Sequence, residues 1–461
     1  MQRKYLDYLN NWLVDKFRKP LLIYGARQVG KTTLIKDLFA KNKFQKYIYI
    51  DFKTDVDERV FIKNHVKAKD IIDYLSFKNN MVIDNNTLII FDEIQECMPC
   101  ITALKYFNQD YNYIPVIASG SMIRIKIHQT EYQKDNIKLD LEISKENQDG
   151  NNNYMFPTGK IYTLEIYPMD FGEYLLNRNT SFYNYLKEKY NSDNKVLDES
   201  MHNLAMKYIY EYMLVGGMPE IVDIFIKTES YARAKQNLIN LYENYLNDMS
   251  LFQISQETIM RTRNVFNSIY MQLEKENKNF KISDIESGKR FRDYMYPLDW
   301  LEAGNIVYKS HLLKERVSYP LKEDEQSLFR IYLSDLGYFT LQSKISGENF
   351  VFDTKDNTLS GIFFENFVAC ELKVRKHELF YWKGKTSSEL EFLIHLDGKI
   401  VPIDVKKNKG SLDSLSKYRQ MNANDLAIKV SQNQYGYDAN KKLLTLPPYY
   451  FGFFLDNAKL I

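Results

Sequence analysis

Short apolar runs alternate with amphipathic stretches in the N-terminal part of the chain. Residues 20–24, 87–91 and 114–118 are dominated by apolar side chains, as in buried strands. Residues 33–40 instead carry apolar side chains at the spacing of an amphipathic helix. Strands that alternate with helices are typical of a parallel sheet flanked by helices. We therefore predict an α/β fold with a parallel-sheet core for residues 1–167.

The pattern becomes helical after this core, and we predict a helical lid or linker for residues 168–254. The sequence Gly-Gly-Met-Pro at 216–219 interrupts it and predicts a helix end followed by a tight turn. Within the core, residues 127–159 are polar and rich in asparagine, which predicts an inserted loop.

Residues 255–335 have the pattern of a winged helix. Their apolar positions predict three helices and a strand, at 263–273, 280–285, 287–303 and 305–308. Lys289, Arg290 and Arg292 fall on the third helix, where a recognition helix displays basic side chains, and they are candidate DNA-binding residues. Alternatively, these charges solvate a helix of a protein-binding module.

The last region, residues 336–461, mixes a helix at 363–372 with strands at 389–394 and 401–406. Asp404 and Lys406 are two positions apart, so on one strand they face the same side. Glu391 on the neighbouring strand and Glu365 on the helix are predicted to approach them. Such a cluster is a candidate metal site, with Lys406 stabilising developing charge. A surface network of salt bridges is the alternative.

The amino-acid composition excludes only a few classes of protein. Lysine and arginine number 62 against 60 aspartates and glutamates, so net charge does not indicate a nucleic-acid or membrane partner. The three cysteines suit a reducing compartment, and no apolar stretch reaches the length of a membrane span. We therefore expect a soluble cytoplasmic protein without a membrane partner. Cys97 and Cys100 form a C-x-x-C without a second cysteine pair, and we expect them to pack rather than to hold a metal.

A complete Walker A loop lies between a predicted strand and a predicted helix, at residues 25–32, Gly-Ala-Arg-Gln-Val-Gly-Lys-Thr. This spacing lets the backbone wrap a polyphosphate. Lys31 can reach the β- and γ-phosphates as a catalytic cation, and the Thr32 hydroxyl can join the Mg²⁺ shell. The predicted ATP-binding residues are Gly25, Ala26, Arg27, Gln28, Val29, Gly30, Lys31, Thr32 and Thr33.

Two further strand ends support this interpretation. The strand at 87–91 is followed by Asp92 and Glu93, the Walker B pattern, in which Asp92 holds the Mg²⁺ shell and Glu93 acts as general base toward water. The third strand ends in Ser119-Gly-Ser121, and either serine is a candidate sensor of the γ-phosphate. Together the three segments predict a P-loop NTPase core that uses ATP and Mg²⁺.

These motifs together resemble a family of predicted ATPases of the AAA+ superfamily. Its members join an AAA core to a C-terminal domain of unknown function, which contains a winged helix and a PD-(D/E)XK, restriction-endonuclease-like fold. The resemblance covers nearly the whole chain. Its markers here are residues 25–32, 91–95, 119–121, 215–220, 364–367 and 402–406.

The chain departs from the family pattern at two places. The family usually carries a Gly-Arg pair before the last core strand, where this chain has Gly159 and Lys160. Lysine keeps the charge but lacks the guanidinium fork. The endonuclease-like motif usually places an aspartate before a glutamate, whereas Glu391 precedes Asp404 here. Exchanging the two carboxylate lengths shifts the geometry of any metal ligands.

The resemblance implies an ATP-hydrolysing protein whose nucleotide state moves its C-terminal modules. One alternative is an ATP-regulated nuclease that acts on DNA through Glu391, Asp404 and Lys406. The other is a nucleotide-switched module that binds DNA or a protein without cleavage. AAA domains often assemble into rings, and Arg124 is the candidate arginine finger for such an oligomer.

Overall fold

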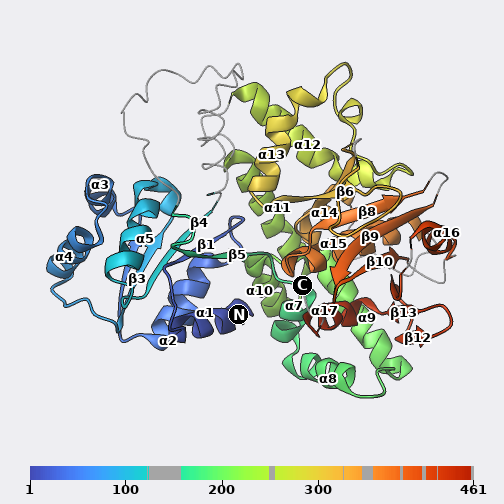
Figure 1. Cartoon of the computed structure of the whole chain (residues 1–461), viewed down its shortest axis with the longest axis horizontal. Coiled ribbons are helices and arrows are strands. Elements are labelled where there is room, and N and C mark those ends of the chain that lie inside the picture. The colour runs from blue at the N-terminus through green and yellow to red at the C-terminus, as the bar shows by residue number, and fades with distance from the viewer. Residues whose placement is uncertain are drawn as a thin grey trace.

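The computed structural model contains two β-sheets with helices between and around them (Figure 1). It describes residues 1–121, 123, 157–248, 255–324, 327–344, 357–384, 388–406, 412–422 and 424–457. No helix among these residues is both long and apolar enough to cross a membrane.

The first sheet is the predicted parallel core. Its strands are β1 (Leu21–Gly25), β2 (Lys46–Asp51), β3 (Thr87–Asp92), β4 (Val116–Ser121) and β5 (Tyr162–Ile166). They lie in the order β2-β3-β4-β1-β5, and every neighbouring pair is parallel. The carboxyl ends of β1, β3 and β4, where the Walker motifs and the two serines lie, therefore meet at one edge of the sheet.

Helices cover both faces of this sheet, as side-chain alternation requires. They are α1 (Tyr5–Val14), η1 (Thr33–Ala40), α2 (Lys41–Lys43), α3 (Val56–Asn64), α4 (Ala68–Asn79), η2 (Ile94–Glu96) and α5 (Pro99–Asp110). Leu21 and Ile23 pack with α1 and η1, whereas Leu22 packs with α4 and α5 on the other face. The predicted helix at 33–40 forms at those residues but is π-helical and continues into α2.

The predicted helical region forms as α7 (Phe171–Arg178), α8 (Thr180–Asn191), α9 (Glu199–Val215), α10 (Pro219–Thr228) and α11 (Tyr231–Asp248). The break predicted at 216–219 separates α9 from α10. Gly216 has a φ of +82°, and a Cβ on Gly217 would lie 2.1 Å from the carbonyl oxygen of Met169. Both glycines are therefore required by this turn.

The second sheet is mixed and contains eight strands in the order β12-β13-β11-β10-β9-β8-β6-β7. They are β6 (Val307–Leu312), β7 (Phe329–Leu333), β8 (Leu379–Lys383), β9 (Glu389–Leu396), β10 (Lys399–Val405), β11 (Ala427–Val430), β12 (Gly436–Asp438) and β13 (Leu443–Leu446). The remaining helical elements are α12 (Gln256–Glu274), η5 (Ile282–Asp284), η6 (Phe291–Asp293), α13 (Met295–Ala303), α14 (Leu336–Ser343), α15 (Asn357–Val374), α16 (Asp413–Met421) and α17 (Pro448–Asn457).

This sheet crosses the predicted boundary between residues 335 and 336. β6 pairs with β7 on one side and, in parallel, with β8 on the other. The strands assigned to a separate winged helix therefore belong to the same sheet as the C-terminal region, and the division at 335–336 is corrected.

The third predicted helix of that unit is also corrected, because α13 begins at Met295 rather than at residue 287. Pro297 lacks an N–H and tolerates only the first turn of a helix, so the helix cannot extend far before it. The segment before it contains Gly288, with a φ of +80°, and the short turn η6. The predicted helix at 280–285 is likewise a single 3₁₀ turn, η5.

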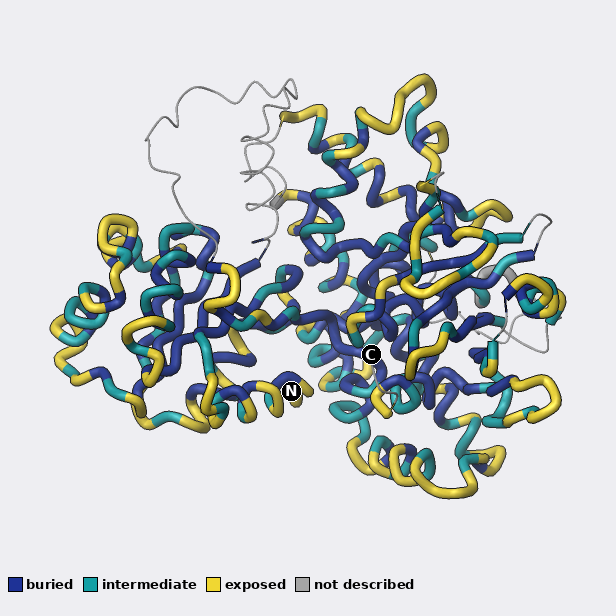
Figure 2. Tube along the Cα trace, in the orientation of Figure 1, coloured by how far each residue is buried: buried dark blue, intermediate teal, exposed yellow. Residues whose placement is uncertain are grey.

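Buried positions follow both sheets and the helices between them, whereas much of α3 and α4 is exposed at the periphery (Figure 2). One hydrophobic cluster extends from Leu21 of β1 to Leu455 of α17. The two halves of the chain therefore share a continuous apolar core. Cys97 and Cys100 are free, buried thiols in the cluster under the other face of the first sheet, as expected for packing residues.

Candidate nucleotide site

The Walker A loop connects β1 to η1 and depends on its glycines. Gly25 has a φ of +154°, and a Cβ there would lie 2.1 Å from the carbonyl oxygen of Ile166 in β5. Gly30 has a φ of +86°, and Gln28 also adopts a left-handed conformation, with a φ of 60°. The backbone thus takes the strained path that the sequence pattern requires.

Lys31 is buried and folded back over the loop. Its Nζ donates to the carbonyl oxygens of Ala26 at 2.7 Å and Gly25 at 3.2 Å. Burial lowers the pKa of Lys31 to about 8, although the nearby carboxylates of Glu93 and Asp92 oppose this shift. The ammonium group is therefore positioned inside the phosphate-binding loop, with two backbone carbonyl oxygens as its hydrogen-bond partners.

Asp92 receives donors from several elements at the carboxyl edge of the sheet. Thr32 Oγ1 donates to its Oδ2 at 2.7 Å, and Tyr49 OH from β2 donates to the same oxygen at 2.8 Å. Its Oδ1 accepts a 2.5 Å hydrogen bond from Ser119 Oγ and one from the Glu93 N–H at 3.0 Å. The predicted pairing of Thr32 with Asp92 is therefore present.

The donor set fits Mg²⁺, which prefers oxygen ligands and keeps several waters or phosphate oxygens in its shell. Thr32 and Asp92 supply a hydroxyl and a carboxylate at one place. Within the described residues, no group of three or more His, Cys, Asp or Glu side chains could hold a metal ion by itself. A metal here would thus need the nucleotide as well as the protein.

Tyr49 was not among the residues predicted from the sequence. Burial and the neighbouring Asp92 carboxylate raise the pKa of its phenol, so it stays a hydrogen-bond donor. Its position on β2 follows from alternation, since Ile48 and Ile50 pack in the cluster on one face of the sheet and Tyr49 packs against the cluster on the other face. The alternation was readable in the sequence, but the pairing of β2 with β3 was not.

The two serines of β4 contact different carboxylates. Ser119 bonds Asp92, whereas Ser121 Oγ makes a long 3.5 Å contact with Glu93 Oε2. The same Glu93 oxygen accepts a hydrogen bond from Gln95 Nε2. Gln95 is a second site residue that the sequence did not single out. A γ-phosphate sensor role for either serine stays a prediction.

The loop is also held from outside the core domain. Arg3 Nη1 donates to the carbonyl oxygen of Val29 at 2.6 Å, and Tyr245 OH from α11 donates to that of Arg27 at 2.5 Å. A Cβ on Gly30 would touch Arg3 and Pro219, the first residue of α10. The N-terminus and the helical lid therefore both contact the phosphate-binding loop.

Buried ions link this loop to the C-terminal half. Arg3 also pairs with Glu173 of α7 at 3.0 Å. Asp170, which caps α7, pairs with Lys4 at 2.6 Å and lies 3.3 Å from Arg375, the residue that follows α15. Burial raises the pKa of Asp170, but the two cations outweigh it and hold that pKa below its usual range.

Arg375 completes this chain of ions within the C-terminal half. It pairs with Glu371 at 2.7 Å and with Asp456 of α17 at 2.6 Å. Glu371 in turn accepts a 2.9 Å hydrogen bond from the N–H of Phe171. Burial raises the pKa of Glu371 to about 7, against the effect of Arg375. The start of α7 is therefore bonded to α15 by both charge and backbone.

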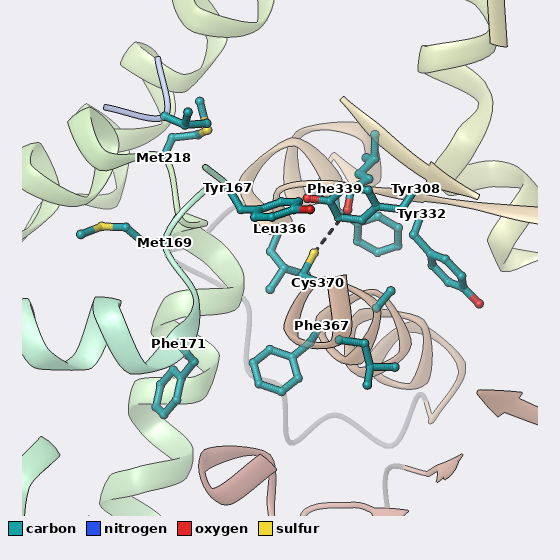
Figure 3. Close-up of a cluster of buried hydrophobic side chains, with 14 of the residues drawn as sticks. Tyr167, Met169, Phe171, Met218, Tyr308, Tyr332, Leu336, Phe339, Phe367 and Cys370 are labelled. Carbon is teal, nitrogen blue, oxygen red and sulfur yellow. Dashed lines mark hydrogen bonds between the residues drawn. The ribbon is translucent and has the colours of Figure 1, made fainter. Parts of the chain in front are cut away.

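The glycine turn after α9 makes a second connection. Asp335, the cap of α14, accepts hydrogen bonds from the N–H groups of Gly217 at 2.6 Å and Gly337 at 2.8 Å. Burial raises the pKa of Asp335 to about 6, although these N–H donors oppose the shift. Apolar side chains surround this junction (Figure 3), among them Tyr167, Met169, Phe171, Met218, Leu336, Phe339, Phe367 and Cys370.

The C-terminal cluster forms around Lys406, just after β10. Its Nζ lies 2.9 Å from Asp404 Oδ1 and 3.0 Å from Glu391 Oε1. Val405 packs into the core on the opposite face, as predicted by alternation. Burial and Glu391 raise the pKa of Asp404 to about 6, and its buried Oδ2 has no hydrogen-bond partner among the described residues.

Glu365 has a different environment, and its predicted place in this cluster is corrected. Its carboxylate accepts a 2.6 Å hydrogen bond from Tyr332 OH and pairs with Lys278 and with Arg330. α15 packs against the face of β10 that carries Val405, so Asp404 and Lys406 lie on the other side of the sheet. The helix therefore does not bring Glu365 to them.

The three basic residues predicted to bind DNA do not lie on a helix of the kind expected. Lys289, Arg290 and Arg292 are exposed on the turns before α13, not on a recognition helix. Lys289 lies 3.8 Å from Glu286. Arg124 falls outside the described residues.

Comparisons with known proteins agree with the N-terminal site. Residues 17–175 match the AAA domain family, and residues 206–349 and 360–449 match the domains of unknown function DUF8612 and DUF4143. The uncharacterized protein MJ1544 of Methanocaldococcus jannaschii is 24% identical over 413 residues, which cover 88% of this chain and 78% of that protein.

Two solved structures are also similar. The Walker-type ATPase PABY2304 of Pyrococcus abyssi covers 74% of this chain and 95% of its own, with 14% identity and a TM-score of 0.42. Protein VC1899 of Vibrio cholerae covers 95% of this chain and 96% of its own, with 10% identity and a TM-score of 0.19. Both TM-scores are low, so the function is inferred from the residues of the chain itself.

The parallel sheet, the Walker loop and the family match together define an AAA-like P-loop ATPase domain at the N-terminus. The winged-helix and endonuclease-like assignments of the C-terminal half remain predictions.

Proposed function

We propose that this chain hydrolyses ATP with Mg²⁺ at the Walker loop and transmits the nucleotide state to its C-terminal half. The observation that carries the proposal is the 2.7 Å hydrogen bond between Thr32 and Asp92, with Glu93 next to it on the same strand end. A hydroxyl, a metal-binding carboxylate and a candidate base at one sheet edge suit phosphoryl transfer to water.

Each side chain has a definite role in this reaction. The loop N–H groups bind the phosphates, and Lys31 exchanges its two backbone carbonyl partners for phosphate oxygens, which carry more charge. Thr32 and Asp92 would hold Mg²⁺, which neutralises charge on the β- and γ-phosphates. Glu93 accepts a proton from the attacking water as the water oxygen bonds to the γ-phosphorus, while the bond from that phosphorus to the bridging oxygen breaks and ADP leaves.

Removing the metal should stop the reaction. We expect wild-type protein to release phosphate from ATP in the presence of Mg²⁺ and to lose this activity in excess EDTA, with recovery when Mg²⁺ is restored. The measurement is the steady-state rate of phosphate release. Hydrolysis that persists in EDTA would contradict the assignment of Thr32 and Asp92, and its absence with Mg²⁺ would contradict the proposed function.

The second part of the proposal is coupling between the halves. The ion chain runs from the Val29 carbonyl through Arg3 and Glu173 in α7, whose cap Asp170 contacts Arg375. Buried ion pairs need close geometry to offset desolvation, so a shift of the loop disturbs their partners. α7 and α15 contribute to one closely packed apolar core. A movement of one helix against the other therefore requires the side chains between them to repack into a second arrangement.

Arg375→Lys tests this coupling, because lysine keeps the charge but cannot bridge Asp170, Glu371 and Asp456 together. In the wild type we expect a non-hydrolysable ATP analogue to change amide hydrogen exchange in α15 and α17. The variant should bind the analogue but show at most about half of that change. Arg419→Lys is the matched control, since Arg419 bonds carbonyls of residues 441 and 442 within the C-terminal half. Equal responses in the two variants would contradict the route.

A second candidate function is metal-dependent cleavage of DNA by the C-terminal half. Its support is the convergence of Glu391, Asp404 and Lys406 and the unpaired, buried Oδ2 of Asp404. Against it, the single ammonium group of Lys406 already pairs with both carboxylates. Incubation of DNA with Mn²⁺ or Mg²⁺, using wild type and Asp404→Asn, decides between cleavage and its absence. DNA binding that falls with salt, without cleavage, favours the non-cleaving module instead.

A further inference from the structure

Glu93, the candidate general base of this site, is held by the side chain of Gln95, two residues later in the chain. Glu93 has a left-handed backbone conformation, with a φ of +52°, and directly precedes the short turn η2. The chain therefore changes direction at Glu93. This turn places Gln95 beside Glu93, and Gln95 Nε2 donates to Glu93 Oε2. The backbone conformation of Glu93 and its side-chain orientation are therefore linked.

Ser121 supports the same arrangement from β4. Its Oγ lies 3.5 Å from Glu93 Oε2 and 3.5 Å from Gln95 Nε2. Both donors face one oxygen of the carboxylate, Oε2. The other oxygen, Oε1, is then the one through which Glu93 can accept a hydrogen bond from water.

Gly120 makes room for this contact. A Cβ at that position would lie 2.5 Å from Gln95 Oε1, which is closer than real Cβ contacts allow. Gln95 itself is 4% exposed, so its amide cannot simply move out to solvent. The sequence Ser119-Gly-Ser121 therefore has three separate tasks. Ser119 bonds Asp92, Gly120 accommodates Gln95, and Ser121 approaches Glu93.

We infer that Gln95 is a positioning residue for the hydrolysis reaction, fixing Glu93 through Oε2 so that Oε1 receives the proton of the attacking water. The inference rests on the proposed function and goes beyond it. The alternative is that Gln95 only fills space in the core. The two roles predict different effects on kcat when the amide is removed and the volume of the side chain is kept.

The test is Gln95→Met, which preserves shape and removes the amide. We expect kcat for ATP to fall about 10- to 100-fold, as for loss of a hydrogen bond to a charged group. KM should stay within about twofold, because the Gln95 amide bonds the candidate base Glu93 rather than a predicted phosphate-binding residue. Gln272→Met is the matched control, since Gln272 is also 4% exposed but lies on α12.

Gly120→Ala provides an independent variant, because its methyl group displaces the Gln95 amide. It should lower kcat similarly and add little further loss in the Gln95→Met background. Additive losses, a Gln95→Met variant that matches Gln272→Met in kcat, or lost ATP binding would each overturn the inference. If wild-type protein with Mg²⁺ does not hydrolyse ATP, the proposed function fails and the inference fails with it; the wild-type rate thus separates the two.

Discussion

Replacing Lys31 with alanine should abolish measurable ATP hydrolysis, a loss of about 10³-fold or more, and should weaken ATP binding. Lys31 is buried within the loop, and its Nζ already lies 2.7 Å from a loop carbonyl. The substitution removes a cation from the phosphate cradle without altering the glycines that shape it. Phosphate release and ATP binding by calorimetry measure the two effects.

The same lysine should impose a pH dependence on ATP binding. Burial lowers the pKa of Lys31 to about 8, so the free protein carries the charge below that pH and loses it above. We therefore expect ATP affinity to fall as pH rises past about 8, and this dependence should disappear in Lys31→Ala. Lys43→Ala, on the exposed end of α2, is the control. Unchanged turnover in Lys31→Ala would refute the site assignment.

Replacing Glu93 with glutamine should have a different result, with ATP still bound but hydrolysis reduced by about 10²- to 10⁴-fold. Glutamine keeps the size of the side chain and removes the charge that accepts a proton from water. The Gln95 amide and Ser121 hydroxyl can still face the side-chain oxygen, so the turn at η2 should be retained.

Equilibrium ATP binding and single-turnover hydrolysis distinguish this outcome from unfolding. Glu96→Gln is the matched control, because Glu96 lies on the same turn and the change removes the same charge. If Glu93→Gln loses ATP binding while Glu96→Gln does not, then Glu93 is structural and the base lies elsewhere.

Some features were predictable because they are local. The Walker A glycines encode backbone angles, and Thr32 follows them directly, so the loop could be placed from spacing alone. Asp404 and Lys406 share a strand end, and strict alternation placed them on one face with Val405 on the other. Pro297 carried a local signal as well, and the prediction of a helix from residue 287 was wrong because it did not weigh the missing N–H.

Other features depend on which elements pack together. Tyr49, Gln95 and Ser121 join the carboxylates of Asp92 and Glu93 because neighbouring strands and one tight turn bring them there. Arg3 reaches the phosphate loop from the N-terminus. None of these contacts follows from a motif, since strand order and register are set by the whole core.

The sequence by itself determined the phosphate loop, the pair of acidic residues after β3 and the alternation of strands and helices at the N-terminus, because each depends on spacing within one short segment. The tertiary structure alone decided that β6 and β7 extend the C-terminal sheet and that Glu365 lies across that sheet from Asp404. It also decided that Arg375 meets Asp170. Each of these features depends on contacts between segments that are far apart in the sequence. Apolar surfaces pack against one another, and charged side chains pair where that packing brings them together.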